Sequence, residues 1–297
     1  MESKLNSPFD LSAIAAYQRW RQHKLDTAPR RIEDIIAEIG DPRRLTPDER
    51  ARLLELNAIA NMAIYISKTG RDPDKEIPRR LGQQLGLRTL DGHWLTDDDA
   101  ISPISVRGAE ERGERREYIP YTDKPIKWHT DGYYNPPERT VRGLLLHCVE
   151  SAAGGGENQL LDPEIAYLLL RDENPEYIRA LSAPDAMTIP PRMDEEGIAR
   201  AEQPGPVFSV DAHGFLHMRY TARTVSIAWK DDAATQAARM ALEHVLATPT
   251  PWTFRARLEP GMGLVCNNVL HDRAGFAETP ERRRLLYRAR YYERVGG

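Results

Sequence analysis

Residues 128–132 read Trp-His-Thr-Asp-Gly and lie near the start of the region that decides the fold. From about residue 118 onward the sequence consists of short apolar runs, separated by turn residues, which predict β-strands. The predicted strands cover residues 141–149, 206–210, 215–220, 253–258, 263–267 and 285–292. Short strands without a regular strand–helix alternation predict an antiparallel double-sheet barrel flanked by helices, within the α+β class. The sequence has no glycine-rich phosphate-binding loop, which disfavours a nucleotide-binding α/β fold.

The sequence also predicts helices, and the first hundred residues read as helical. Isoleucines at positions 32, 35, 36 and 39 recur with helical spacing and predict an amphipathic helix. Residues 46–49, Thr-Pro-Asp-Glu, form the capping box of a second helix, and the pattern breaks at Pro78. Asp162 and Asn174, each followed by proline, open a helix pair over residues 163–182, and residues 231–248 predict a further helix. The charged run at residues 105–119 predicts a solvated loop.

Composition narrows the class of protein. The chain has 297 residues and a formal charge of −4, a balance that disfavours nucleic-acid binding through bulk positive charge. No apolar stretch approaches the length of a membrane span, and the first residues lack the apolar core of a signal peptide. Cys148 and Cys266 are too few for a disulfide framework. We therefore expect a cytoplasmic globular protein without a membrane partner.

His129 and Asp131 are candidate metal ligands. In an extended segment the side chains of residues i and i+2 point the same way, so both can face one ion. A His and a carboxylate, completed by a second distant His, make the facial triad of non-haem Fe(II) oxygenases. Eight histidines and 45 acidic residues in this chain produce about one His-x-acid pair by chance. On the pair alone, a turn aspartate beside a core histidine is the favoured interpretation.

The C-terminal quarter adds the missing elements. Residues 266–276 read Cys-Asn-Asn-Val-Leu-His-Asp-Arg-Ala-Gly-Phe, with His271 as the distant histidine. In the predicted strand 285–292, period 2 places Arg284, Arg288 and Arg290 on one face. Guanidinium groups grip a carboxylate with two parallel hydrogen bonds, so these arginines indicate an anion site. The alternative is a solvated basic strand.

Together these motifs resemble the taurine dioxygenase-like family of Fe(II)/2-oxoglutarate-dependent oxygenases, which includes the γ-butyrobetaine hydroxylase and clavaminate synthase branches. The resemblance covers roughly residues 118–294. It implies a double-stranded β-helix, or jelly roll, over residues 118–297. Apart from the resemblance, we expect a helical N-terminal region, residues 1–117, that packs on that core within one structural domain; packing against a second subunit and a share in the substrate pocket are the alternatives. The resemblance further implies that His129, Asp131 and His271 bind Fe(II).

The resemblance also assigns a co-substrate site. Arg284 falls on the arginine that anchors the far carboxylate of 2-oxoglutarate, and Arg288 on a second arginine that contacts the other end of the co-substrate or an anionic substrate. The glycine run 154–156 resembles the loop in which a threonine usually binds the same carboxylate. Asn158 stands at that position here, and its amide can donate a hydrogen bond in place of the hydroxyl.

The substrate pocket is the least defined part of the resemblance. Tyr133 and Tyr134 follow the His-x-Asp motif and are candidates to line it, with structural packing as the alternative. Arg223 is a candidate to bind an anionic group, with a surface salt bridge as the alternative. His147 and Cys148 alternate on a predicted central strand, and we expect both to be core residues.

The function that the resemblance implies is that of an enzyme. With Fe(II), 2-oxoglutarate and O₂ it would oxidise, most often hydroxylate, an unactivated C–H bond of a small charged or amino-acid-like metabolite and release succinate and CO₂. Asp131 fills the position that halogenating relatives leave open for chloride, which disfavours halogenation. Two alternatives stay open, namely a facial-triad iron enzyme that does not use 2-oxoglutarate and a non-catalytic 2-oxoglutarate-binding protein. Also open are the substrate's identity, desaturation or cyclisation as the outcome, and homo-oligomer formation.

Overall fold

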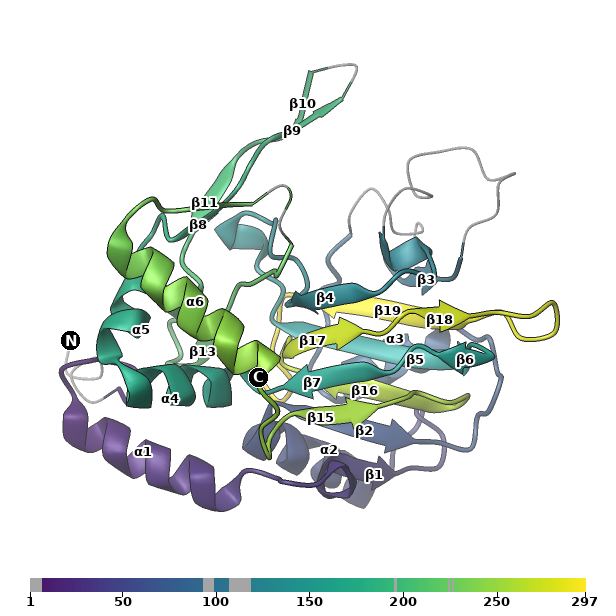
Figure 1. Ribbon diagram of the computed structural model, residues 1–297. Coiled ribbons are helices and arrows are strands. Elements are labelled where there is room, and N and C mark those ends of the chain that lie inside the picture. Colours follow the sequence, from purple (N-terminus) through teal and green to yellow (C-terminus); the bar gives the residue numbers. More distant parts are fainter. Residues whose placement is uncertain (1–6, 93–98, 107–118, 195–196, 224, 226) are drawn as a thin grey trace.

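The computed structural model, shown in Figure 1, describes residues 7–92, 99–106, 119–194, 197–223, 225 and 227–297. The chain forms two main β-sheets with helices around them, which confirms the α+β class. Most of the charged run predicted as a loop at residues 105–119 lies outside the described residues.

The larger sheet has six strands in the order β1-β2-β16-β5-β19-β3. Its strands are β1 (Ile36–Glu38), β2 (Met62–Ile66), β3 (Ser102–Ile104), β5 (Gly143–Glu150), β16 (Met262–Cys266) and β19 (Leu285–Tyr291). All neighbours pair antiparallel except β1 and β2. The smaller sheet, in the order β15-β7-β17-β4, has β4 (Ile126–His129), β7 (Asn158–Leu161), β15 (Phe254–Ala256) and β17 (Leu270–Arg273).

The two sheets face each other across a shared apolar core. Leu146, Leu264 and Leu286 of the larger sheet cluster with Leu160 and Phe254 of the smaller one. Strand alternation sends the other set of side chains to the outer face, where Leu145, Val265 and Ala289 pack with helix residues. Those helices are α2 (Pro47–Ala60) and α3 (Glu76–Gln84). Among the described residues the two sheets share no strand pairing and do not form a closed barrel. The predicted double-sheet arrangement is therefore present, but the predicted barrel closure is not.

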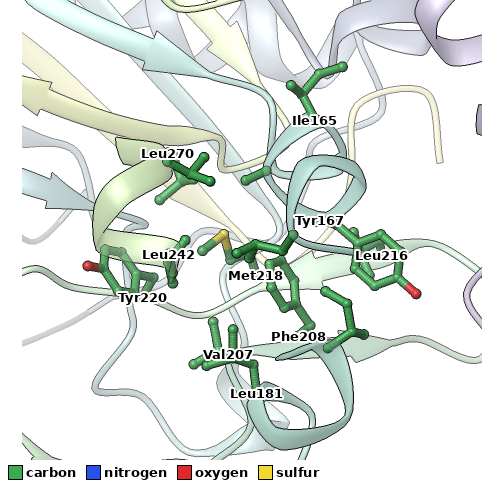
Figure 2. Packing of buried hydrophobic residues seen from close by; sticks show 14 of the residues in the cluster. Ile165, Tyr167, Leu181, Val207, Phe208, Leu216, Met218, Tyr220, Leu242 and Leu270 are labelled. Carbon is green, nitrogen blue, oxygen red and sulfur yellow. The ribbon is translucent and has the colours of Figure 1, made fainter. Parts of the chain in front are cut away.

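A helical layer covers one end of the sheets, on the left of Figure 1. It contains α1 (Ile14–Thr27), α4 (Pro163–Glu173), α5 (Pro175–Leu181) and α6 (Ala233–Ala247). Figure 2 shows its core, in which Tyr167 of α4 and Leu242 of α6 surround Phe208 and Met218. Leu270 belongs to the same cluster, so this layer packs directly on strand β17 of the smaller sheet.

Shorter elements complete the described chain. The remaining strands are β6 (Gly154–Gly155), β8 (Met187–Ile189), β9 (Arg192–Asp194), β10 (Gly197–Arg200), β11 (Gln203–Gly205), β12 (Phe208–Val210), β13 (Leu216–Met218), β14 (Ala228–Trp229) and β18 (Phe276–Ala277). Single 3₁₀ turns occupy Ile32–Ile35, Ile119–Tyr121 and Pro137–Arg139. None of the helices in the described ranges is long and apolar enough to cross a membrane.

Most of the predicted elements are confirmed. Each of the six predicted strand segments contains a strand. The helix predicted to begin at residues 46–49 is α2, and those predicted at 163–182 and 231–248 are α4–α5 and α6. The capping reasons hold as well, because Asp162 and Asn174 accept hydrogen bonds from the N–H groups of Glu164 and Glu176. Thr46 and Glu49 form the reciprocal capping box of α2.

The prediction of an amphipathic helix at residues 32–39 is wrong. The segment begins with a 3₁₀ turn and continues as β1, which pairs in parallel with β2 through Ile36 and Ile64. A short isoleucine run fits either periodicity, and β-branched residues favour the strand once a partner strand is available.

The expectation of a helical N-terminal region is wrong in part, because this region contains three strands as well as helices. β1, β2 and β3 are part of the larger sheet, beside β16 and β19. Pro78 does not break the helical pattern either, because it lies in the first turn of α3, where its missing N–H leaves no bond unmade.

Candidate metal centre

His129, Asp131 and His271 come together where β4 ends. His129 and His271 are paired across β4 and β17, and their ring centroids are 4.2 Å apart. Asp131 follows β4 by two residues and places Oδ1 3.4 Å from Nε2 of His129 and 3.9 Å from Nε2 of His271. One donor atom from each residue lies within 4.8 Å of the others. Among the described residues no other group of three His, Cys, Asp or Glu side chains lies close enough to hold a metal ion.

Both imidazole rings are held with Nε2 toward the carboxylate. Nδ1 of His129 lies 2.9 Å from the carbonyl oxygen of Lys127, and Nδ1 of His271 lies 2.9 Å from that of Val269. A carbonyl oxygen only accepts hydrogen bonds, so each Nδ1 carries the proton and each Nε2 keeps a free lone pair. Burial also lowers the pKa of His271 to about 4, so its ring is neutral at physiological pH. Neutral imidazoles in this tautomer are the form that binds a metal ion.

Asp131 is ionised although it is buried. Burial alone would raise its pKa, but the positive charges of Arg288 and Arg290 hold the pKa well below its usual range. Nη1 of Arg288 lies 3.3 Å from Oδ2, yet the geometry is not that of a hydrogen bond, and Oδ2 has no hydrogen-bond partner among the described residues. A buried carboxylate with an open oxygen beside two imidazole lone pairs fits a divalent cation.

The residue that the sequence reasoning missed is Asn268. Its Oδ1 accepts a hydrogen bond from the N–H of Asp131 at 2.8 Å, and its Nδ2 donates to the carbonyl of the same residue at 2.9 Å. Asn268 has a positive φ of 51°, a conformation that asparagine tolerates better than most residues. The asparagine pair before Val269 was the only sequence signal for this role.

A second polar site surrounds Arg284. This side chain is 6% exposed, its Nη1 has no hydrogen-bond partner in the described structure, and burial lowers its pKa to about 10. The guanidinium groups of Arg284 and Arg273 lie 5.0 and 4.9 Å from the ring centroid of Phe276. A buried guanidinium with an open donor fits a carboxylate ligand.

The glycine run forms one wall of this site. Gly155 and Gly156 line it together with Asn158. Gly155 has a φ of 75°, and a Cβ at this position would collide with the carbonyl oxygen of Gly275. The Asn158 side chain donates from Nδ2 to the backbone carbonyl of Asp272. Asn158 therefore lines the same pocket as Arg284, with one of its two N–H donors engaged.

Arg288 and Arg290 are less open to a ligand than their sequence predicts. No acid intervenes between them in the strand, but acids reach them from other segments. Arg290 forms a buried ion pair with Asp91 at 2.6 Å and donates to the hydroxyl of Tyr134 at 2.7 Å. Arg288 faces Asp131. Arg284, the residue before β19, donates its backbone N–H to Glu278, but its guanidinium forms no ion pair within the described residues.

Tyr133 and Tyr134 follow Asp131 in the chain and pack, partly buried, against the apolar core of the helical layer. The rings of Tyr133 and Tyr134 contact edge to face with their centroids 5.2 Å apart. Arg223 is exposed, and its Nη1 lies 3.4 Å from the Tyr133 hydroxyl. Thr221, two residues before Arg223, forms a β-bridge with His129, so this segment runs alongside the cluster.

His147 and Cys148 are core residues, as the sequence predicts. Nδ1 of His147 lies 2.9 Å from the Tyr65 hydroxyl, and burial lowers the pKa of His147 to about 4. Burial raises the pKa of the Cys148 thiol to about 12, so it is an unreactive thiol rather than a nucleophile.

Comparison with known proteins places this site in a family. The model of the taurine catabolism dioxygenase TauD, TfdA family matches residues 79–290, well over half of the chain. The chain belongs to this family of non-haem Fe(II)- and 2-oxoglutarate-dependent dioxygenases. Fe(II) and 2-oxoglutarate are accordingly its cofactor and co-substrate, and the resemblance read from the motifs is confirmed.

Individual relatives are more distant. A uridine-5'-phosphate dioxygenase from Amycolatopsis sp. is 34% identical over 175 residues, which cover 56% of this chain and 60% of that protein. The matched part thus spans less than two thirds of this relative.

Two solved structures share the fold. Asparagine oxygenase, in complex with Fe(II), 2S,3S-3-hydroxyasparagine and succinate, has a TM-score of 0.58 at 14% identity and covers 82% of this chain and 78% of its own. The non-heme iron oxygenase OrfP, in complex with Fe and L-Arg, has a TM-score of 0.57 at 18% identity and covers 84% of this chain and 81% of its own.

Proposed function

We propose that His129, Asp131 and His271 are the protein ligands of the catalytic Fe(II). The convergence of two Nε2 lone pairs and an ionised, buried carboxylate carries this proposal. Three ligands on one side of the ion leave its remaining positions to the co-substrate and O₂. When bound, the iron with 2-oxoglutarate and O₂ supplies the oxidation of an unactivated C–H bond, with succinate and CO₂ as co-products.

We further propose that Arg284 binds the far carboxylate of 2-oxoglutarate. The open Nη1 of this buried side chain supports the assignment, because a carboxylate would satisfy it and compensate the buried charge. Asn158 contributes its remaining amide N–H at the same end. Arg288, already close to Asp131, keeps that ligand ionised and faces the other end of the co-substrate or an anionic group of the substrate.

The substrate we propose is a small anionic or amino-acid-like metabolite, hydroxylated at an unactivated carbon. Tyr133 and Tyr134, which follow Asp131 in the chain, offer aromatic faces, and Arg223 offers a guanidinium without a carboxylate partner in the described chain. A planar group against the tyrosines and an anion at Arg223 would fit this arrangement. Because the Amycolatopsis relative is a uridine-5'-phosphate dioxygenase, uridine 5'-phosphate is the first compound to test, followed by asparagine and arginine.

The test is a turnover screen with purified protein, Fe(II), 2-oxoglutarate and ascorbate under air. We expect one compound to give succinate in proportion to an oxidised product, identified by mass spectrometry. Asp131→Ala should abolish coupled product formation. Asp272→Asn, which alters the neighbouring carboxylate bonded to Gln159, should retain it. Coupled product formation by Asp131→Ala at saturating iron would overturn the ligand assignment, and iron binding without succinate under any substrate condition would overturn the use of 2-oxoglutarate.

A further inference from the structure

The third ligand of the cluster lies outside the strand pairing that holds the other two. His129 and His271 are opposite each other in the ladder of β4 and β17, so sheet hydrogen bonds fix their spacing. Asp131 comes two residues after the last residue of β4. Its position relative to the histidines must therefore depend on other contacts.

Asn268 supplies those contacts in the manner of a strand residue. Its side-chain amide bonds both the N–H and the carbonyl of Asp131, as a paired backbone residue would. Nδ2 also donates to the carbonyl of Val141 at 2.7 Å, so the amide makes three hydrogen bonds at 1% exposure. Only an amide of this length offers an acceptor and two donors at these positions.

The turn that carries Asn268 is itself tied down on its far side. The N–H of Asn267 donates to the carbonyl of Asn61 at 2.8 Å, and its side chain bonds the side chain of Asn61 and the N–H of Val295. Asn61 in turn donates to Asp162 at 3.0 Å. Nζ of Lys24, on α1, lies 2.6 Å from the same carboxylate. The turn is thus anchored to the N-terminal helix as well as to β17.

We propose that Asn268 is a positioning residue that sets the Asp131 carboxylate against the two histidines, with the Asn61–Asn267 contacts holding Asn268 in place. This inference rests on the proposed function of His129, Asp131 and His271 as a metal site. It gives the N-terminal region a role in the centre through Asn61 and Lys24, although neither touches the metal ligands.

The experiment measures Mn(II) affinity of the metal-free protein by calorimetry under anaerobic conditions. Asn268→Asp keeps the size and the backbone tolerance of asparagine but removes both donors, so we expect the fold to persist and the affinity to fall 10- to 100-fold. Asn268→Ala should weaken binding at least as much. The matched control is Asn57→Asp in α2, a buried asparagine whose Nδ2 donates to the carbonyl of Leu53. It should match the loss of thermal stability without changing Mn(II) affinity.

A double-mutant cycle with Asp131→Ala identifies the route of the effect. If Asn268 acts through Asp131, Asn268→Asp should change Mn(II) affinity less than twofold in the Asp131→Ala background. Wild-type affinity in both Asn268 variants, or a full effect that persists without Asp131, would overturn the positioning role. Wild-type affinity in Asp131→Ala alone would instead overturn the proposed metal site, so the two failures are distinguishable.

Discussion

Replacing Arg284 by alanine tests the co-substrate site in a way that separates binding from chemistry. The side chain is 6% exposed, its Nη1 lacks a partner in the described structure, and the carboxylate of 2-oxoglutarate is the partner we propose. Removing one member of a buried ion pair typically costs about 3–5 kcal/mol. At about 1.4 kcal/mol per tenfold change, Arg284→Ala should raise the Kd of 2-oxoglutarate by roughly 100-fold or more.

The assay is anaerobic calorimetric titration of 2-oxoglutarate into the Mn(II)-loaded protein. Arg284→Lys should recover only part of the affinity, because an ammonium keeps the charge but lacks the planar fork of donors. Arg282→Ala is the matched control, since Arg282 is two residues away, partly exposed and paired with Glu150 and Ser151. An unchanged Kd in Arg284→Ala would refute the assignment.

The same variant has a second expected effect, on the protein without co-substrate. Burial lowers the pKa of Arg284, which means that the folded state holds its charge at a cost. Arg284→Ala should therefore unfold at a temperature no lower than the wild type when 2-oxoglutarate is absent. Added 2-oxoglutarate should raise the unfolding temperature of the wild type and leave that of the variant unchanged. A large loss of stability in the variant without ligand would contradict this reasoning.

Three further predictions concern stability. Asp91→Ala leaves the buried Arg290 guanidinium without its carboxylate partner and should lower the free energy of unfolding by about 3–5 kcal/mol in urea titrations. A loss below about 1 kcal/mol would contradict a buried ion pair between these residues. The charge of Arg290 and the hydrogen bonds to Asp91 outweigh its burial and hold its pKa below the usual value. Ionised Asp91 therefore stabilises the fold at neutral pH, and this stabilisation is lost as the pH falls through the folded-state pKa. Asp91→Asn should accordingly show a shallower loss of stability in acid. Burial lowers the pKa of His147 to about 4, so between about pH 6.5 and 4 the unfolded chain is protonated at this residue and the folded chain is not. Acid therefore favours the unfolded state, and His147→Phe should reduce the fall of the urea midpoint between pH 6.5 and 4. An unaltered fall would exclude His147 as its cause.

The parts of the fold that follow from local sequence are those that were predicted. Thr46, Asp162 and Asn174 form caps with residues two or three positions away, so the information lies in the same few residues. Residues 32–39 carry no such local signal. Their isoleucines become a strand because β2 lies beside them, and a partner strand is not visible in a short window of sequence.

The candidate site divides in the same way. The i, i+2 spacing of His129 and Asp131 predicts that their side chains lie close together, as they do although β4 ends at His129. The motif resemblance adds His271. The partners of Arg288 and Arg290 could not be predicted, because Asp131 and Asp91 come from segments more than 150 residues away in the chain. The role of Asn268 could not be predicted for a related reason. Its side chain bonds backbone groups, which every residue carries, and so it leaves no complementary residue in the sequence.

A Mn(II) titration followed by electron paramagnetic resonance tests the metal site itself, independently of substrate and turnover. We expect the wild-type protein to bind one Mn(II) per chain, and Asp131→Ala to bind it at least 100-fold more weakly, since it loses the buried charged ligand at a cost of about 3–5 kcal/mol. His129→Ala and His271→Ala should weaken binding as well, while His213→Ala, an exposed histidine in the turn after β12, should not. Equal Mn(II) affinity in the wild type and in Asp131→Ala would contradict the assignment of His129, Asp131 and His271 as the metal ligands.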